Sequence, residues 1–221
     1  MSKPFQEELT ELNNEIRKMG TLAEEAVAKS IAALKNRDIK AAQAVIDGDT
    51  QVDELELVID ERCLDLIARF QPMAVDVRFI TTGMRLNGEL ERIADIAVDI
   101  AERVIPIVEQ PLVKPLVDIP RLMALSQKMV WMSIEAFISR DSELAKEVLF
   151  LDPEADALRD SVQKELIEEY MEKDPQVIAR AVQMLLIARY LERVCDHATY
   201  IAEDVIYMVN AEVVKHHPER L

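Results

Sequence analysis

LERIADIAVDIAERVI (residues 90–105) and LERVCDHATYIAEDVI (residues 191–206) are two copies of one stretch of sequence within the same chain. The copies begin 101 residues apart and are identical at ten of sixteen positions. Chance is a poor explanation for that many matches. Because an internal repeat determines the architecture before any detail does, we infer that the chain contains two similar units.

The duplication extends upstream of these two stretches, at a separation of 103 residues. The equivalent pairs are Arg37-Asp38 with Arg140-Asp141, Asp49 with Asp152, Asp53 with Asp156, and Pro72 with Pro175. A two-residue difference in length between Pro72 and Leu90 reconciles the two separations. The repeat therefore predicts two units with a pseudo-two-fold relation.

Apolar residues recur at alternating spacings of three and four, which is typical of amphipathic helices in a bundle. We expect helices over residues 5–35, 38–70, 72–105, 120–139, 141–172 and 174–214. Asp38 is expected to cap the second, and Pro72 to lie in the first turn of the third, where a missing amide hydrogen costs little. Short breaks make sequential helices antiparallel. The predicted fold is all-α, with two tandem antiparallel three-helix bundles and six long helices.

A proline-rich stretch, PIVEQPLVKPLVDIP (residues 106–120), separates the two units. Four prolines in fifteen residues are incompatible with a continuing helix. We therefore assign residues 1–106 to the first unit, 107–119 to a linker and 120–221 to the second unit.

The composition of the chain limits the fold classes and the binding partners that it can have. It has 221 residues, four glycines, 5% aromatic residues and a net charge of −16, which favours helices and disfavours binding to nucleic acid or unaided docking on anionic lipid. Cys63 and Cys195 give no disulfide framework. No signal peptide and no apolar run of the ~20 residues needed to cross a bilayer is evident, so we expect a cytoplasmic protein.

Four pairs of carboxylates are the candidate site. They are Asp49 with Asp53, Glu91 with Asp95, Asp152 with Asp156, and Glu192 with Asp196. A spacing of four places both members on one helix face, where like charges repel. Such a cluster either raises its pKa values or binds a cation, and an all-oxygen ligand set favours Mg, Ca, Mn or iron. The alternatives are surface charge preserved after duplication, or an acidic patch that binds a partner.

Other polar residues receive structural interpretations. Ile96 stands where the second copy has His197, and we interpret His197 as structural. Arg92 and Arg193 are interpreted as partners in surface ion pairs, with ligand orientation as the alternative. Gly48 beside Asp49 indicates either a close backbone approach or a tolerated kink. No motif nominates a catalytic nucleophile.

The order and duplication of the motifs DTQVD (49–53), LERIADIAVDIAE (90–102), DPEAD (152–156) and LERVCDHATYIAE (191–203) resemble the PhoU family over nearly the whole chain. The resemblance implies a non-enzymatic adaptor that couples the phosphate ABC transporter to a sensor histidine kinase and negatively regulates phosphate uptake and the phosphate-starvation regulon. It implies binding to the transporter's ATPase subunit and to the kinase, a homodimer, and contact with the membrane only through partners.

The resemblance also implies that the eight carboxylates hold iron, zinc, manganese or magnesium. Between the copies, Asp99 becomes Tyr200 and Glu56 becomes Arg159, so the two sites are expected to differ in affinity or metal. Two other functions stay open: a metal-dependent phosphoester hydrolase, and an accessory protein of a low-affinity phosphate permease.

Overall fold

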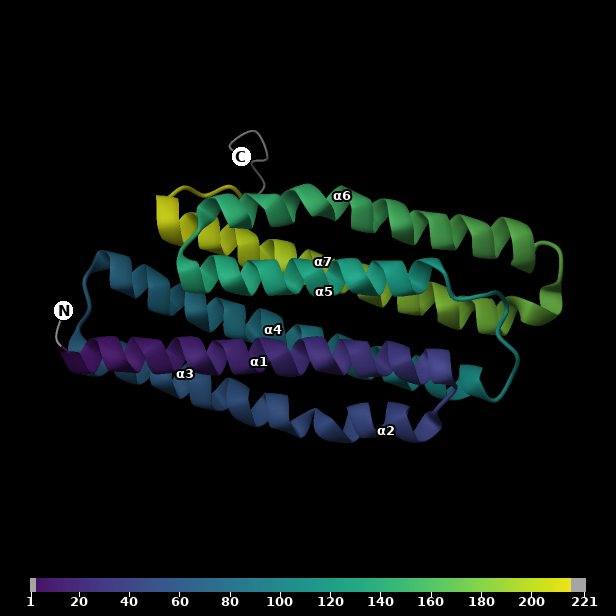
Figure 1. Ribbon diagram of the computed structural model, residues 1–221, viewed down its shortest axis with the longest axis horizontal. Helices are drawn as coiled ribbons and strands as arrows, with labels where there is room; N and C mark the ends of the chain where they lie inside the picture. The colour runs from purple at the N-terminus through teal and green to yellow at the C-terminus, as the bar shows by residue number, and fades with distance from the viewer. Residues whose placement is uncertain (1–2, 216–221) are drawn as a thin grey trace.

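The computed structural model describes residues 3–215 as a bundle of long helices (Figure 1). They are α1 (Lys3–Asn36), α2 (Ile39–Gly48), α3 (Thr50–Phe70), α4 (Ala74–Val108), α5 (Asp118–Ser139), α6 (Ser142–Glu165) and α7 (Ile178–Asn210). A π-helical turn, η1 (Leu166–Met171), and a 3₁₀ turn, η2 (Pro175–Val177), join α6 to α7. No strand occurs within residues 3–215, and α2 with α3 forms one broken helix. The predicted all-α fold with six long helices is thus confirmed.

The same cap begins the second helix of each half. Asp38 accepts a hydrogen bond from the backbone amide of Ala41 at 3.0 Å. The carboxylate of Asp141 accepts hydrogen bonds from two backbone amides in the first turn of α6, both at 3.0 Å. Arg37 and Arg140, directly before these caps, adopt left-handed φ values of 57° and 56°. The duplicated Arg-Asp pair therefore marks an equivalent turn in each half, because the carboxylate satisfies free amides at a helix start.

The start of α4 differs from the prediction, which placed Pro72 in the first turn of the helix. Gln71 adopts a left-handed φ of 45° and ends α3, and α4 begins only at Ala74. Pro72 therefore lies in the link between the two helices. Pro175, the equivalent residue of the second half, does begin a helical turn, η2, directly before α7.

Three helices end at residues other than those predicted. One of them is α6, which was expected to reach residue 172 but gives way to the π-helical turn η1 after Glu165. Pro106 lies inside α4, which continues to Val108. Proline is tolerated there because it removes one backbone hydrogen bond close to the end of the helix, where little of the ladder follows. The last helix, α7, ends at Asn210 instead of Val214, because Ala211 takes a left-handed φ of 58°.

The break between α2 and α3 falls at Gly48 and Asp49. A methyl group added at Gly48 would have no neighbouring atom within 4 Å. The backbone therefore makes no close approach there, and a tolerated kink is the correct interpretation. In the second half, α6 runs through Pro153 at the equivalent place.

Three basic side chains attach the linker between the halves, residues 109–117, to the bundle. Lys114 is buried and pairs with Glu165 at the end of α6. Arg37 donates to the backbone carbonyls of Val108, the last residue of α4, and of Gln110 in the linker, at 2.6 and 3.0 Å. Arg180, on α7, donates to the carbonyl of Pro111 at 2.7 Å. These contacts hold the prolines of the linker against both halves.

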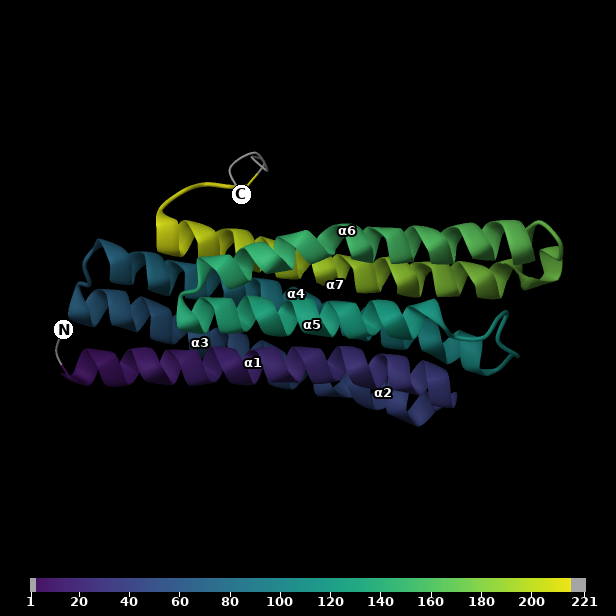
Figure 2. The same ribbon diagram turned by 45° about the horizontal axis from the view of Figure 1, so that its top comes forward.

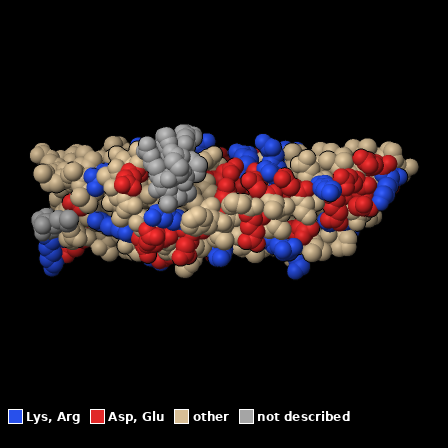
Figure 3. Space-filling view, turned by 90° about the horizontal axis from the view of Figure 1, so that it is seen from above, with Lys and Arg blue, Asp and Glu red and all other residues tan. Residues whose placement is uncertain are grey.

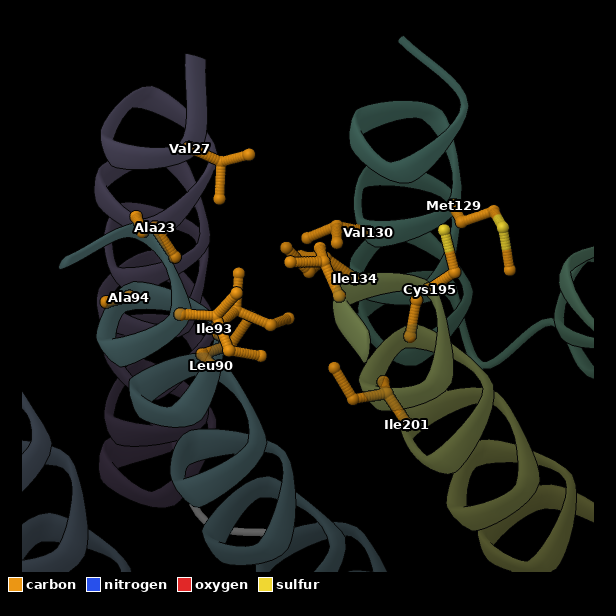
Figure 4. Packing of buried hydrophobic residues seen from close by; sticks show 14 of the residues in the cluster. Ala23, Val27, Leu90, Ile93, Ala94, Met129, Val130, Ile134, Cys195 and Ile201 are labelled. Carbon is orange, nitrogen blue, oxygen red and sulfur yellow. The ribbon is translucent and has the colours of Figure 1, made fainter. Parts of the chain in front are cut away.

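The two halves share one hydrophobic core. In Figures 1 and 2, helices α1–α4 form one side of an elongated bundle and α5–α7 the other. Across the junction, α4 packs along α7 and α1 packs along α5. Figure 4 shows Leu90 and Ile93 of α4 on one side of this junction, with Val130 and Ile134 of α5 on the other. Because the apolar faces of both three-helix units meet here, neither unit buries its core alone.

Among the helices within residues 3–215, none has the combination of length and apolar character required to cross a membrane.

Gly20 allows the close approach of α1 and α5, and its substitution tests the shared core. A methyl group added at Gly20 would lie 2.2 Å from Cδ1 of Ile134. We expect Gly20→Val to lower the free energy of unfolding by about 1–3 kcal/mol, because added carbons must displace packed side chains. Urea denaturation monitored by circular dichroism measures this loss.

The matched control for Gly20→Val is Gly48→Ala, since space around Gly48 is open. Alanine favours helix over glycine, so this control is expected to gain up to about 1 kcal/mol. If Gly20→Val is as stable as the wild type, then α1 and α5 are not tightly packed at this point.

Candidate metal centre

The first cluster is a ladder of carboxylates between α3 and α4. Asp49 directly precedes α3, and the spacings of four, three and four place the carboxylates of α2–α3 on one helix face. The antiparallel neighbour α4 presents its own carboxylates to the same side. The members of the first cluster are Asp49, Asp53, Glu56 and Asp60 on one strip, with Glu91 and Asp95 on the other.

The pKa values of the first cluster show that the helices bring its charges together. The pKa of Glu91 is raised to about 7, first by burial and then by repulsion from Asp95 and Glu56. The pKa of Asp49 is raised by burial and by repulsion from Asp53 and Asp95. All four residues predicted in the first half therefore interact across α3 and α4. The prediction that such a cluster raises its pKa values is confirmed for Asp49 and Glu91.

Asn87, one turn before Glu91 on α4, extends this ladder. Its side chain is fully buried, and its Nδ2 donates to the backbone carbonyl of Glu56 at 2.9 Å and to Oδ1 of Asp60 at 3.1 Å. Within the described residues its Oδ1 has no hydrogen-bond partner. A buried oxygen without a partner is costly, so it marks an unmet polar interaction beside the carboxylates.

The second cluster lies between α6 and α7 and contains the other four predicted residues: Asp152, Asp156, Glu192 and Asp196. The pKa of Asp152 is raised by burial and then by repulsion from Asp196 and Asp156. The pKa of Asp196 is likewise raised, first by burial and then by Asp156. Each half of the molecule thus assembles one cluster from its second and third helices, as the spacing predicts.

Arg159 lies within the second cluster and pairs with its carboxylates. One guanidinium nitrogen contacts Glu192 on α7, and another lies 3.0 Å from the nearest carboxylate oxygens of both Asp156 and Asp160 on α6. Burial and Asp196 raise the pKa of Glu192, whereas the positive charge of Arg159 opposes the shift. The red acidic side chains in Figure 3 likewise lie beside blue basic ones.

As the side chains stand, no three His, Cys, Asp or Glu residues within residues 3–215 come close enough to one another to hold a metal ion. Within the described part of the chain, the clusters gather negative charge on facing helices without bringing three carboxylates together around one point. Binding of a cation therefore requires side chains of neighbouring turns to rotate toward a common centre.

The histidine and the cysteines have the structural environments predicted for them. Nδ1 of His197 lies 2.5 Å from the carboxylate of Glu89, and its ring packs edge-on against Tyr200. Cys63 and Cys195 are both buried and unpaired by disulfide. Burial raises the pKa of Cys63 to about 12 and also raises that of Cys195. Neither thiol is therefore set up as a nucleophile.

The surface ion pairs expected for Arg92 and Arg193 are absent among residues 3–215. The guanidinium of Arg193 lies 5.9 Å from the ring centre of Tyr190 instead. Arg92 is exposed, and its charge lowers the pKa of Glu91 against the larger effects that raise it. That prediction is wrong, because neither guanidinium lies within 4 Å of a carboxylate in the described part of the chain, although the charge of Arg92 still acts on Glu56 of α3.

Sequence reasoning missed three members of the first ladder as site residues. Glu56 and Asp60 continue the spacing of Asp49 and Asp53 by three and then four residues. Extending the helical register by two more turns would therefore have found them. Asn87 gives no such signal, because an uncharged residue on an apolar helix face is not distinguished by pattern alone.

Together the fold and the clusters define a class: a duplicated, all-helical bundle protein with one carboxylate cluster between the second and third helices of each half. The family model described as PhoU domain matches twice, over residues 16–104 and 119–205. The chain belongs to the PhoU family.

Similar proteins match over nearly their whole length. The "Phosphate-specific transport system accessory protein PhoU homolog" of Aquifex aeolicus is 39% identical, with 95% of this chain and 94% of that protein covered. The protein of the same description from Rhizobium meliloti is 38% identical, with 92% and 86% covered. The crystal structure of PhoU from Pseudomonas aeruginosa superposes with a TM-score of 0.88 at 35% identity, with 94% and 100% covered.

Proposed function

We propose that this protein is a regulatory accessory protein of a phosphate-specific transport system. The observation that carries the proposal is the match of both halves to the PhoU domain, at a length nearly equal to that of the Aquifex aeolicus protein. That relative is described as an accessory protein of phosphate-specific transport. The match covers 94% of that protein, which supports the same role for this chain.

In its finer form, the proposal is a cytoplasmic adaptor without catalytic activity. It couples the ATPase subunit of the phosphate ABC transporter to a sensor histidine kinase, and so lowers phosphate uptake and expression of the phosphate-starvation genes. It meets the membrane through these partners and acts as a homodimer. A net charge of −16 supports basic surfaces on protein partners and disfavours nucleic acid.

The proposal includes a divalent metal ion at the carboxylate clusters, with iron, zinc, manganese and magnesium as candidates. The first cluster fits such an ion in its chemistry, because its ligands are all oxygen and hard cations prefer oxygen. Repulsion and burial raise the pKa values of Asp49, Glu56 and Glu91 there. A bound cation would remove that repulsion and tie α3 to α4, and the unpartnered Oδ1 of Asn87 offers a neutral oxygen beside them.

Deletion of the gene, followed by growth in phosphate-rich medium, tests the regulatory role. We expect expression of the phosphate-starvation genes to rise, because the adaptor no longer reports sufficiency to the kinase. The wild-type chain returned on a plasmid should restore repression. A tagged chain purified under the same conditions should carry the transporter's ATPase subunit and the kinase with it.

Lys29→Ala serves as the control in these complementation and purification experiments. Lys29 is exposed and pairs only along its own helix with Glu25 at 2.7 Å, so the variant should behave as the wild type. Unchanged gene expression on deletion, together with neither partner in the purified material, would contradict the adaptor role.

A further inference from the structure

The two clusters differ at three positions that the internal repeat makes equivalent. These pairs are Glu56 with Arg159, Asp60 with Gln163, and Asn87 with Ala188. Two carboxylates and one amide of the first half are therefore replaced in the second half by a guanidinium, an amide and a methyl group. The first cluster has six carboxylates, whereas the second has four and an arginine.

Arg159 joins the two helices of the second cluster in the way that a bound cation would. Its side chain reaches from α6 to Glu192 on α7 and also contacts Asp156 on its own helix at 3.0 Å. Arg159 is only 24% exposed and the side chain of Glu192 only 12% exposed. A guanidinium bound to carboxylates from both helices lowers their repulsion from within the chain, and its charge opposes the rise in the pKa of Glu192.

The first cluster lacks such a counterion. The equivalent residue, Glu56, adds a negative charge, and its pKa is raised by burial and by Asp60, Asp53 and Asp95. Arg92 is the basic residue whose charge acts on this cluster, but it is exposed and, within the described residues, forms no ion pair. Repulsion in the first half is therefore left for an external cation to relieve.

We infer that Arg159 is a built-in counterion that takes the place of a metal ion in the second cluster, and that metal is bound in the first cluster alone. The inference rests on the metal role proposed above. It makes Glu56 a ligand or near neighbour of the metal and assigns the two halves different tasks. In the second half, Arg159 holds α6 and α7 together at all times. In the first half, α3 and α4 are held together only when metal is bound.

Thermal unfolding without metal tests the counterion by itself. In the presence of a chelator, Arg159→Gln should lower the Tm by about 2–4 °C, because Asp156, Asp160 and Glu192 lose their cationic partner. The double variant Arg159→Gln/Asp156→Asn should regain part of that loss, since one repelling charge is gone. The control is Arg121→Gln, which removes the pair between the exposed side chain of Arg121 and Asp118 and should leave the Tm unchanged.

Two outcomes of the unfolding experiment would overturn the counterion role. One is an unchanged Tm for Arg159→Gln. The other is a loss that the second substitution, at Asp156, does not reduce, because that pattern belongs to lost packing of the arginine stem. Neither outcome depends on whether the protein binds metal.

Equilibrium dialysis against Mn²⁺ tests where metal binds. The variant Asp53→Asn/Asp95→Asn should lose at least tenfold in Mn²⁺ affinity, whereas Asp156→Asn/Asp196→Asn should bind as the wild type does. Glu56→Arg should imitate the second half and abolish Mn²⁺ binding. Arg159→Glu should allow additional Mn²⁺ to bind, at the second cluster. Equal losses in the two double variants overturn the assignment to the first cluster. Mn²⁺ that binds neither the wild type nor Arg159→Glu overturns the metal role itself.

Discussion

Replacing Phe137 by alanine is expected to lower the free energy of unfolding by about 3–5 kcal/mol, because it removes a fully buried aromatic ring from the junction of the two halves. Phe137, on α5, stacks on Phe79 of α4 with ring centres 4.7 Å apart and planes at 14°. The guanidinium of Arg140 lies 4.5 Å from the centre of the Phe79 ring. The substitution therefore opens a cavity where three groups from both halves meet.

Chemical denaturation by urea measures this loss, with Phe150→Ala as the control. Phe150 lies on α6 and is 69% exposed, so its removal should change the free energy of unfolding by no more than about 0.5 kcal/mol. The wild type should unfold in one transition, since α4 and α7 share a core. If Phe137→Ala costs no more than the control, or if the halves unfold separately, the shared core does not hold the molecule together.

The second large effect concerns Mn²⁺ and the charges of the first cluster. At a Mn²⁺ concentration of about 100 times its Kd, binding to the folded state alone adds about 2.7 kcal/mol to the free energy of unfolding. For a chain of this size the Tm should rise by roughly 5–10 °C. We expect Asp53→Asn/Asp95→Asn to abolish this rise while making the metal-free protein more stable at pH 8. The double substitution thus stabilises the metal-free protein but removes the stabilisation by Mn²⁺. Both effects arise because the same carboxylates repel one another without metal and bind the metal when it is present.

The pH dependence of the metal-free protein follows from Glu91. Its pKa is raised from 4.5 to about 7 in the folded state, so the folded state binds the proton more tightly than the unfolded state does. The stability gained from that proton is fully present below pH 4.5 and is lost as the pH rises through 7. Mn²⁺ competes with the same proton, so its effect on Tm should weaken below pH 7.

Differential scanning fluorimetry at pH 6, 7 and 8, with chelator or with Mn²⁺, measures both effects. The control is Glu25→Gln/Asp65→Asn, which removes two exposed carboxylates outside both clusters and should respond to Mn²⁺ as the wild type does. A rise in Tm that persists undiminished in Asp53→Asn/Asp95→Asn would place the bound metal elsewhere on the protein.

The asymmetry between the halves suggests how one chain could combine a stable scaffold with a responsive part. Under the proposal above, Arg159 lowers the repulsion in the second cluster at all times, whereas the first cluster depends on an external cation. Since α4 packs along α7, a change in the packing of α4 against α3 would be transmitted to the second half through the shared core. Such a connection would suit a protein that reports the state of one partner to another.

Much of the candidate site could be predicted from the sequence, because the relevant information is local. A spacing of four residues places two carboxylates on one helix face whatever the helix packs against. The duplication then shows that Asp49 with Asp53 and Asp152 with Asp156 occupy equivalent places. The Arg-Asp caps follow in the same way, since a capping carboxylate bonds amides only two or three residues away.

Helix ends were less predictable than helix faces. The continuation of α4 past Pro106 and the end of α7 at Asn210 depend on single backbone conformations. A left-handed residue such as Ala211 has no strong sequence signal, because glycine and asparagine are the residues that usually take this conformation.

The sequence by itself therefore determined the helical class, the duplication, the linker region and the pairing of carboxylates along each helix. Only the tertiary structure decided that the halves share one core through α4 and α7, that Asn87 joins the first ladder, and that Arg159 reaches across to Glu192. Helical periodicity acts over three or four residues, so a short stretch of sequence contains all the information needed to detect it. Which faces meet across about a hundred residues depends on side-chain volume and on the path of the chain, and these are settled only when the whole bundle packs.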